Sequence, residues 1–266
     1  MASGNDEEYP SEATGLALET VSKHAADSDI VLFGSWFCPS VQRAWVAAEY
    51  LGIPYKKPKD LLELSPKGLV PAVKLNNFSP ARGLNESTVI VDYLEGLGAT
   101  TTKRSLLPPR TDTYAHALVR LQADHICSAV VPAFYRHLQA QGQQAQVDTK
   151  HAFVAALERL AELFERAERE VGGTGLWKEG GELGYADVLV GPWIFRVTNV
   201  LAHYRGFEMP KGPKFTAWVQ RVLEHPAFKC TCSADDAYIQ AYVSYAYDRP
   251  KTNQVAIPTT SGRGFP

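Results

Sequence analysis

Apolar positions follow a mixed pattern in the first hundred residues. Short apolar or β-branched runs bounded by Gly, Pro and Asn predict strands. These strands lie at residues 30–34, 53–57 and 70–75, with a weak one around Arg82 and Leu84. In residues 39–51 and 86–97 the apolar positions instead recur at steps of three and four, which predicts two helices, the second stopped by Gly98. This part of the chain is expected to be mixed α/β.

Beyond residue 110 only the helical spacing remains. The predicted helices cover residues 111–141, 149–171, 185–205, 213–224 and 234–245. The fold class is therefore an α/β part followed by an all-α bundle. The expected organisation is an N-terminal extension at 1–28, an α/β domain at 29–100, a linker rich in Thr, Arg and Pro at 101–110, a helical domain at 111–247 and a tail at 248–266.

Composition excludes several classes of partner. The chain has 27 Lys and Arg against 29 Asp and Glu, a formal charge of −2, so no overall field attracts nucleic acid or an anionic membrane. Its first residues lack the basic and then apolar pattern of a secretory signal. The longest apolar stretch, residues 186–195, has about half the length needed to cross a bilayer. We expect a cytoplasmic protein that binds neither nucleic acid nor membrane.

Four cysteines are too few and too irregularly spaced for a disulfide framework. Cys127 lies in an apolar helical context, where a thiol usually acts as a small hydrophobe. The pair Cys230 and Cys232 has no second ligand pair at zinc spacing, so we expect no metal.

Cys38 is the candidate nucleophile. It follows a predicted strand and precedes Pro39, a favoured first residue of a helix, so it is expected to be the N-cap of helix 39–51. A thiolate there faces free backbone amides and the positive end of the helix dipole, which predicts a lowered pKa. Val41 occupies the position where a dithiol oxidoreductase has its second cysteine, so the partner thiol must come from another molecule, for which glutathione is the obvious supplier. The alternative is an inert cysteine at a helix start.

Three motifs resemble those of a known family. Residues 37–43 read FCPSVQR, similar to the FCPxxQR signature of omega-class glutathione transferases, including those of fungi. Residues 65–71 read SPKGLVP and resemble the family's NPxGxVP loop, and Glu86-Ser87 resembles the ES that opens its third helix. The resemblance covers roughly residues 29–246. It implies a thioredoxin-like, glutathione-binding domain followed by a helical domain, in agreement with the division above.

The resemblance also implies which residues bind glutathione. The expected contacts are Phe37, Lys57, Leu69, Val70, Pro71, Glu86 and Ser87. In the family the proline is cis, which turns the backbone of Val70 toward the cysteinyl part of glutathione. Ser87 and Glu86 would bind the carboxylate and the ammonium of the γ-glutamyl group. Taken alone, Pro71 also fits an ordinary turn, and Glu86-Ser87 also fits a helix cap.

Lys57 resembles in placement the omega-class lysine that holds the glycyl carboxylate of glutathione, and Lys59 is close enough to compete. For either one, a solvated surface lysine is the alternative. In the helical part, residues 184–188 resemble the family's S/T-x-x-D box, but Gly184 replaces the hydroxyl residue. We expect Asp187 to be structural, bonding the first amides of its helix.

The acceptor pocket is expected between the two domains, lined by Trp36, Tyr135 and Trp193. Burial in the core is the alternative for Trp193. Tyr238, Tyr242 and Tyr245, near the end of the chain, are further candidates to cover the site.

These inferences predict glutathione-dependent thiol transfer, that is deglutathionylation through a mixed disulfide on Cys38, with glutathione as co-substrate and a hydrophobic or glutathionylated acceptor. The resemblance implies dehydroascorbate or phenacyl-glutathione reduction as further activities, a role in detoxification and a homodimer. Ser35 and Ser40 flank Cys38 and leave a minor conjugating activity open.

Two alternative hypotheses assign the protein to a different functional class. One is a non-enzymatic protein that holds hydrophobic ligands or regulates a partner on the same fold. The other is a relative of the chloride channels that share this fold, which insert a hydrophobic segment after the cysteine. Arg43, Glu49 and the lysines at 56, 57 and 59 disfavour such an insertion.

Overall fold

A three-stranded antiparallel sheet forms the centre of the first part of the molecule. The computed structural model describes residues 10–58 and 70–247. Its strands are β1 (Ile30–Phe33), β2 (Ala72–Leu75) and β3 (Arg82–Asn85), in the order β1-β2-β3. β1 is buried along its whole length, as expected for a run of apolar residues, whereas β3 is largely exposed.

The predicted strand at 53–57 is reduced to a single parallel bridge between Val31 and Lys56. The amide of Leu32 donates to Lys56 O at 2.9 Å and that of Lys56 to Ile30 O at 2.8 Å, so the segment runs beside β1. Pro54 and Pro58 flank it in the sequence, and neither has an N–H to extend the ladder. The pairing therefore stays short.

Two helices pack together beside the sheet. α2 (Pro39–Leu51) has the predicted bounds and is buried on nearly all sides. α3 (Ser87–Thr101) runs past Gly98, so the prediction that this glycine stops the helix is wrong. A Cβ at Gly98 would lie 2.9 Å from Leu51 Cδ2, and the glycine instead allows α3 to approach α2 closely.

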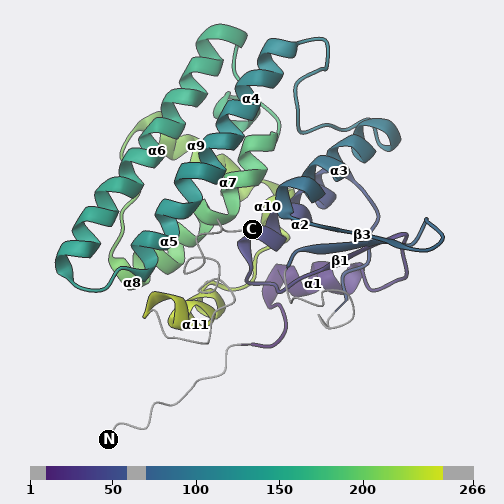
Figure 1. The fold of residues 1–266 in the computed structure, drawn as a ribbon, viewed down its shortest axis with the longest axis horizontal. Helices are drawn as coiled ribbons and strands as arrows, with labels where there is room; N and C mark the ends of the chain where they lie inside the picture. Colours follow the sequence, from purple (N-terminus) through teal and green to yellow (C-terminus); the bar gives the residue numbers. More distant parts are fainter. Residues whose placement is uncertain (1–9, 59–69, 248–266) are drawn as a thin grey trace, which may run out of the picture.

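The second part is helical throughout, with irregular turns inside two of the predicted helices. The elements are α4 (Thr113–His125), the π-helical turn η1 (Ile126–Val130), α5 (Val131–Gln139), α6 (Gln143–Val171), the 3₁₀ turn η2 (Gly175–Trp177), α7 (Tyr185–Arg196), the π-helical turn η3 (Val197–Leu201), α8 (Ala202–Arg205), α9 (Pro213–Glu224), α10 (Pro226–Lys229) and α11 (Asp235–Ala246). The long members of the bundle are α6 and the continuous run of α4, η1 and α5 (Figure 1). The expected fold class, α/β followed by all-α, is confirmed.

The first described helix, α1 (Gly15–Lys23), corrects the expectation of a separate extension at 1–28. Its Ala17 is fully buried and donates its amide to Cys232 O at 3.1 Å. Thr20 Oγ1 donates to Cys230 O at 2.8 Å. The buried face consists of the small residues Ala17, Thr20 and Val21. Of the expected extension, residues 10–28 belong to the folded part, and the expected tail at 248–266 lies outside the described residues.

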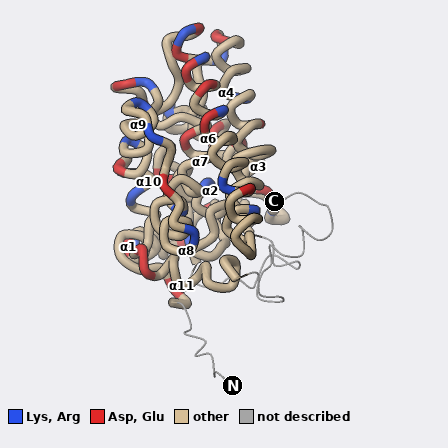
Figure 2. The backbone as a smooth tube through the Cα atoms, turned by 90° about the vertical axis from the view of Figure 1, so that its left-hand side faces the viewer, with Lys and Arg blue, Asp and Glu red and all other residues tan. Residues whose placement is uncertain are grey.

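Charged residues are mixed over the surface. In Figure 2, Lys and Arg alternate with Asp and Glu over α4, α6 and α9, and neither sign dominates the face in view. This distribution agrees with the formal charge of −2. Within residues 10–58 and 70–247, no helix combines the length and the apolar character that a membrane span requires.

Candidate functional site

Cys38 is the N-cap of α2, as predicted. Its backbone is extended, with φ −76° and ψ 120°, and Pro39 occupies the first helical position. The amide of Cys38 donates to Ser35 O at 3.2 Å, and its carbonyl accepts the first helical bond from Gln42 at 3.1 Å. The chain therefore turns sharply between β1 and α2 and presents the thiol at the start of the helix, with the residue partly accessible.

The prediction of a lowered Cys38 pKa is wrong for this arrangement. Surrounding protein desolvates the sulfur, although part of the residue remains accessible, and this burial raises the pKa of the thiol. The backbone amides of Val41 and Ser40 lower the pKa, as do the charges of Arg196 and Lys57, but their combined effect is smaller. The helix start is present as expected, and burial outweighs it.

Residues of the helical part enclose this region. Arg196, at the end of α7, donates from Nη2 to Phe37 O at 3.0 Å, and Tyr242 of α11 donates its hydroxyl to the same carbonyl at 3.3 Å. Tyr135 of α5 and Tyr242 both interact electrostatically with the Cys38 thiol. Two residues of the helical part thus fix the backbone carbonyl of Phe37, directly before the nucleophile.

Arg196 was not predicted from the sequence, whereas Tyr242 was one of three tyrosines expected to cover the site. A signal existed for Arg196, because it directly follows the apolar run 186–195 and a single arginine within a buried helix needs buried partners. The hydrogen bond from Tyr242 to Phe37 O could not be predicted, because 205 positions separate the two residues.

Gln42 of the 37–43 motif links α2 to the helical part. Its Oε1 accepts from Arg196 Nη1, and its Nε2 donates to Thr231 Oγ1 at 3.0 Å. All three residues are buried. A buried amide whose oxygen and nitrogen both have partners fixes the orientation of the two elements.

Arg43 of the same motif connects three elements. Its Nε donates to Leu189 O of α7 at 2.8 Å, and its Nη1 donates to Ser87 Oγ of α3 at 3.1 Å. The guanidinium also stacks 4.2 Å from the Trp193 ring centroid. Arg43 therefore holds the start of α3, where the γ-glutamyl group of glutathione was expected.

The expected glutathione contacts gather around the N-terminus of α3 and the start of β2. Ser87 is the first residue of α3 and is 2 % exposed, so its hydroxyl faces Arg43 rather than solvent. Glu86 is exposed and has φ 68°, an unusual conformation for a non-glycine residue. Val70 is half-buried and its bond to Pro71 is cis, as the resemblance implied. Leu69 and Lys59 lie outside the described residues.

Lys57 lies in the interior. It is 4 % exposed, its Nζ donates to Gly34 O at 3.0 Å, and it lies 4.7 Å from the Trp45 ring centroid. Burial lowers its pKa to about 8. This position does not favour the expected contact with a glycyl carboxylate, which requires an ammonium at the surface, and it also rules out a solvated surface lysine.

The aromatic residues expected in the acceptor pocket divide into two groups. Trp36 is 5 % exposed and donates its Nε1 to Pro10 O at 3.0 Å, and Trp193 is 1 % exposed beneath Arg43, so the structure places both in the core. Tyr135 is also buried, but it lies close enough to Cys38 to interact with it electrostatically. Tyr135 therefore lies in the neighbourhood of the thiol.

Asp187 is structural, as predicted. Its Oδ2 accepts from the amides of Leu176 at 2.7 Å and Gly184 at 2.9 Å, and its Oδ1 accepts from Trp218 Nε1 at 2.8 Å. The missing hydroxyl at Gly184 has a steric cause: a Cβ there would lie 2.8 Å from Gly175 Cα.

The other three cysteines are also free. Burial is the main cause that raises the pKa of Cys230 to about 11 and that of Cys232 to about 12, so both are neutral thiols at pH 7. Cys127 is exposed, which corrects the expectation of a thiol acting as a small hydrophobe, and Arg43 Nη2 approaches its sulfur at 3.9 Å.

Comparisons with known proteins agree with this geometry. Residues 37–97 match the family model "Glutathione S-transferase, N-terminal domain". The crystal structure of glutathione transferase Omega 3C from Trametes versicolor is 30% identical in sequence, with a TM-score of 0.74 over 90% of this chain and 100% of that one. Glutathione S-transferase U17 of Arabidopsis thaliana is 28% identical over 214 residues, 77% of this chain and 90% of the relative.

A Tau-class glutathione S-transferase from mango has the same fold, with 24% identity and a TM-score of 0.64 over 81% of this chain and 98% of that one. The fold thus consists of a thioredoxin-like domain with a small sheet, followed by a helical domain. The chain belongs to the glutathione transferase family. The similarity extends to members of more than one class of this family.

Proposed function

We propose that this protein is a cysteine-type, omega-like glutathione transferase that performs thiol transfer through Cys38. The observation that carries the proposal is the thiol at the N-cap of α2, with Val41 where a dithiol enzyme has its second cysteine. A serine or tyrosine hydroxyl at this place would stabilise glutathione as a free thiolate for conjugation, whereas a thiol can bond to it. The 30% identity to an enzyme named Omega supports the same class.

Glutathione would bind beside the start of α3. The backbone of Val70 would pair with the cysteinyl unit, with Leu69, Pro71 and Phe37 beside it, and Glu86 would pair with the γ-glutamyl ammonium. The amide of Ser87 at the N-terminus of α3 would receive the γ-glutamyl carboxylate. Arg43 supports this anion site, because its guanidinium lies 3.1 Å from Ser87 Oγ and adds positive charge behind it.

The chemistry consists of two thiol exchanges. The Cys38 thiolate attacks the glutathionyl sulfur of a glutathionylated acceptor, a Cys38–glutathione disulfide forms, and the acceptor thiolate leaves with the electron pair and takes a proton from water. The thiolate of a second glutathione then attacks the same glutathionyl sulfur, which releases oxidised glutathione and the Cys38 thiolate. One glutathionylated acceptor and one glutathione give one free thiol and one oxidised glutathione.

The acceptor would approach Cys38 beside Tyr135 and Tyr242, which lie on the helical side of the thiol. Aromatic surface at a domain interface suits a hydrophobic acceptor. Dehydroascorbate and phenacyl-glutathione are the small acceptors to assay first. The four free cysteines fit a reducing compartment such as the cytoplasm.

The test is mass spectrometry of the protein after incubation with oxidised glutathione, combined with turnover of a glutathionylated disulfide. The wild type and Cys127→Ser should each carry one glutathione adduct on Cys38 and turn the substrate over. Cys38→Ser should lose both the adduct and the turnover. Cys127 is the matched control because it is the most exposed of the other thiols.

Unchanged turnover in Cys38→Ser would refute the proposal. Saturable binding of glutathione by the wild type without an adduct and without turnover would instead favour a non-enzymatic, ligand-binding protein on this fold.

A further inference from the structure

A buried lysine beside the nucleophile requires a physical explanation, because lysine is almost never buried without a partner. Lys57 is 4 % exposed, on the short segment that runs parallel to β1. Its Nζ donates to Gly34 O at 3.0 Å, just after β1 ends and four residues before Cys38. The ammonium is thus fixed to the loop that carries the thiol.

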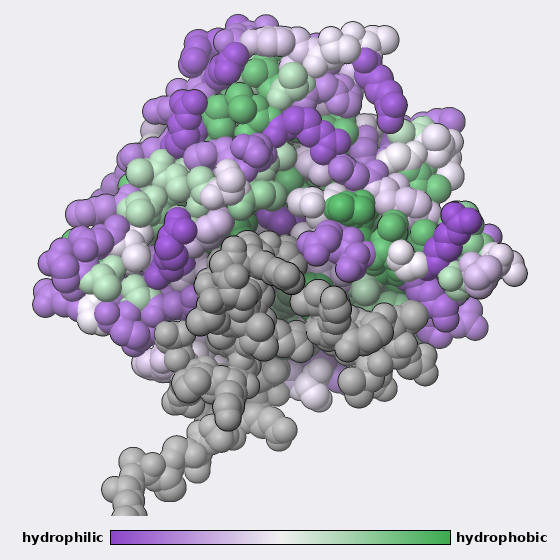
Figure 3. Space-filling model, viewed as in Figure 1, coloured by the Kyte–Doolittle hydropathy of each residue, from purple (hydrophilic) through white to green (hydrophobic). Residues whose placement is uncertain are grey.

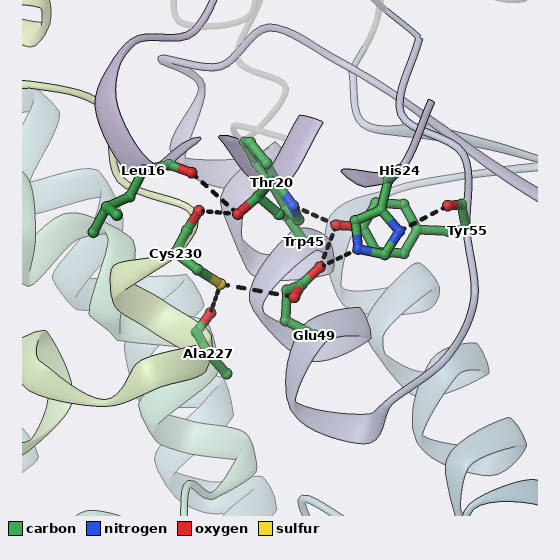
Figure 4. A network of polar contacts seen from close by, with 8 residues as sticks. All are labelled: Leu16, Thr20, His24, Trp45, Glu49, Tyr55, Ala227 and Cys230. Carbon is green, nitrogen blue, oxygen red and sulfur yellow. Dashed lines mark hydrogen bonds and ion pairs between the residues drawn. The ribbon is translucent and has the colours of Figure 1, made fainter. Parts of the chain in front are cut away.

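The Trp45 ring provides a second contact for the ammonium, at 4.7 Å from its centroid. This ring is itself held in place: Trp45 Nε1 donates to Tyr55 OH at 2.6 Å, and Tyr55 OH donates to Glu49 Oε1 (Figure 4). His24 completes the network with a 2.9 Å contact from Nε2 to the same Glu49 oxygen. The face of the indole toward Lys57 is therefore set by a connected polar network, and the lysine has little freedom to leave its place.

Lys57 and Cys38 interact electrostatically with each other in the folded protein: the lysine lowers the pKa of the thiol, and the thiolate raises that of the lysine. The other charged or titratable groups that face the thiol are Arg196 of α7, Tyr135 of α5 and Tyr242 of α11. Arg196 is already bonded to Gln42, Phe37 and Pro192. Lys57, on the segment beside β1, is the second cation that lowers the pKa of the thiol.

We propose that Lys57 is a positioning residue that stabilises the Cys38 thiolate from inside the protein. Its ammonium is held between Gly34 O and the Trp45 ring, where no described carboxylate forms a salt bridge with it that would offset its charge. The proposal deepens the proposed function, because it explains how a buried thiol reacts.

The same placement favours both exchange steps. The attacking species in the first step is the Cys38 thiolate, and the leaving group in the second step is again the Cys38 thiolate. In the mixed disulfide between them the sulfur is neutral, so Lys57 loses the opposite charge and holds its own proton less tightly. Release of the thiolate restores the ion pair, and the ammonium thus stabilises the sulfur whenever it is anionic.

The rival explanation is purely structural, since Lys57 could serve only to hold the loop through Gly34 O. The two roles differ in what Lys57→Met changes. A structural role predicts lower stability with an unchanged Cys38 pKa, whereas the proposal predicts a higher pKa. Lys57→Arg keeps the charge and should restore most of the wild-type pKa if the variant folds.

The experiment is the rate of alkylation by iodoacetamide as a function of pH, in a Cys127→Ser background so that Cys38 is the reactive thiol. Lys57→Met should raise the midpoint of the pH profile by about one pH unit or more, the scale expected for loss of a nearby opposite charge. Lys56→Met is the matched control: it removes an equal charge one position away, from a lysine that pairs with Asp27 at 2.7 Å. Its midpoint should not move.

The proposal would be overturned if folded Lys57→Met had the same alkylation midpoint as the wild type, or if Lys56→Met shifted the midpoint as much as Lys57→Met does. Circular dichroism shows whether each variant is folded. If Lys57→Met does not fold, the pH profile of Lys57→Arg provides the test instead. A wild-type midpoint in Lys57→Arg supports the proposal, and a midpoint raised by about one pH unit or more counts against it. Alkylation needs no glutathione. If Lys57→Met shifts the midpoint but the wild type forms no glutathione adduct, the role of Lys57 is supported and the proposed function is rejected.

Discussion

Burial of an ammonium disfavours the folded state, and Lys57 carries this penalty at neutral pH. Its pKa is lowered from 10.5 to about 8, so between these two values the unfolded chain binds a proton that the folded chain does not. The free energy of unfolding should therefore rise as the pH increases from about 8 to about 10.5. Below pH 8 the penalty is constant.

Lys57→Met should consequently be more stable than the wild type at pH 7, by up to about 3 kcal/mol if the shift of Lys57 acts alone. The difference should shrink as the pH approaches 10.5. Urea unfolding at pH 7 and pH 10 measures it, with Lys56→Met as the control that should show neither effect. Lower stability of Lys57→Met at pH 7 would show that the contacts to Gly34 and Trp45 outweigh the desolvation.

At the scale of single residues, the sequence predicted what depends on neighbours in the chain. Cys38 as an N-cap follows from Pro39 directly after it, and the structure agrees. The contacts of Arg196 with Phe37 and Gln42 could not be predicted, because 159 and 154 positions separate these residues. The raised Cys38 pKa could not be predicted either, because it is caused by burial in the folded protein. Lys57 was expected to hold the glycyl carboxylate of glutathione, or else to be a solvated surface lysine, and its interior position beside Trp45 depends on tertiary packing.

Individual elements show the same division. The bounds of α2 were predicted to the residue, since its apolar periodicity, its proline and its final glycine all agree. α3 was predicted too short because a glycine fits either a helix end or a close helix contact, and only the position of Leu51 distinguishes them. The short helices η2 and α10 were missed because three or four residues carry no periodicity.

The entry into α7 yields a prediction at this scale. Gly184→Ser would restore the hydroxyl expected at this N-cap, yet it should destabilise the protein by about 1–3 kcal/mol, because the added Cβ would lie 2.8 Å from Gly175 Cα. Thermal unfolding measures the change. Gly212→Ser is the matched control at the N-cap of α9, where a Cβ would meet no atom within 4 Å, and it should be neutral or slightly stabilising. Equal effects of the two substitutions would contradict the steric explanation.

For the whole molecule, we propose a homodimer formed through α3 and α4. The 3.0 Å ion pair between Asp92 of α3 and Arg120 of α4 links these two helices. Val89 on α3 and Leu121 on α4 are 47 % and 41 % exposed, unusual for large apolar side chains, and Figure 3 shows apolar residues gathered over α3.

Light scattering after size exclusion should therefore give twice the 29.3 kDa of one chain. Val89→Asp combined with Leu121→Asp should shift the mass toward one chain. Val147→Asp on α6 is the control, since Val147 is equally exposed at 41 % but lies on another helix. A monomeric wild type would reject the dimer.

The contact between α1 and residues 230–233 has a consequence for biosynthesis. The helix near the start of the chain is held by the carbonyl oxygens of Cys230 and Cys232, which leave the ribosome more than 200 residues later. While the chain is being made, the thioredoxin-like domain therefore cannot acquire all of its native contacts. The hydrogen bond from its buried Gln42 to Thr231 also cannot form until Thr231 has been synthesised. The nascent protein should depend on chaperones until synthesis is nearly complete, and release from them should coincide with the docking of this last segment.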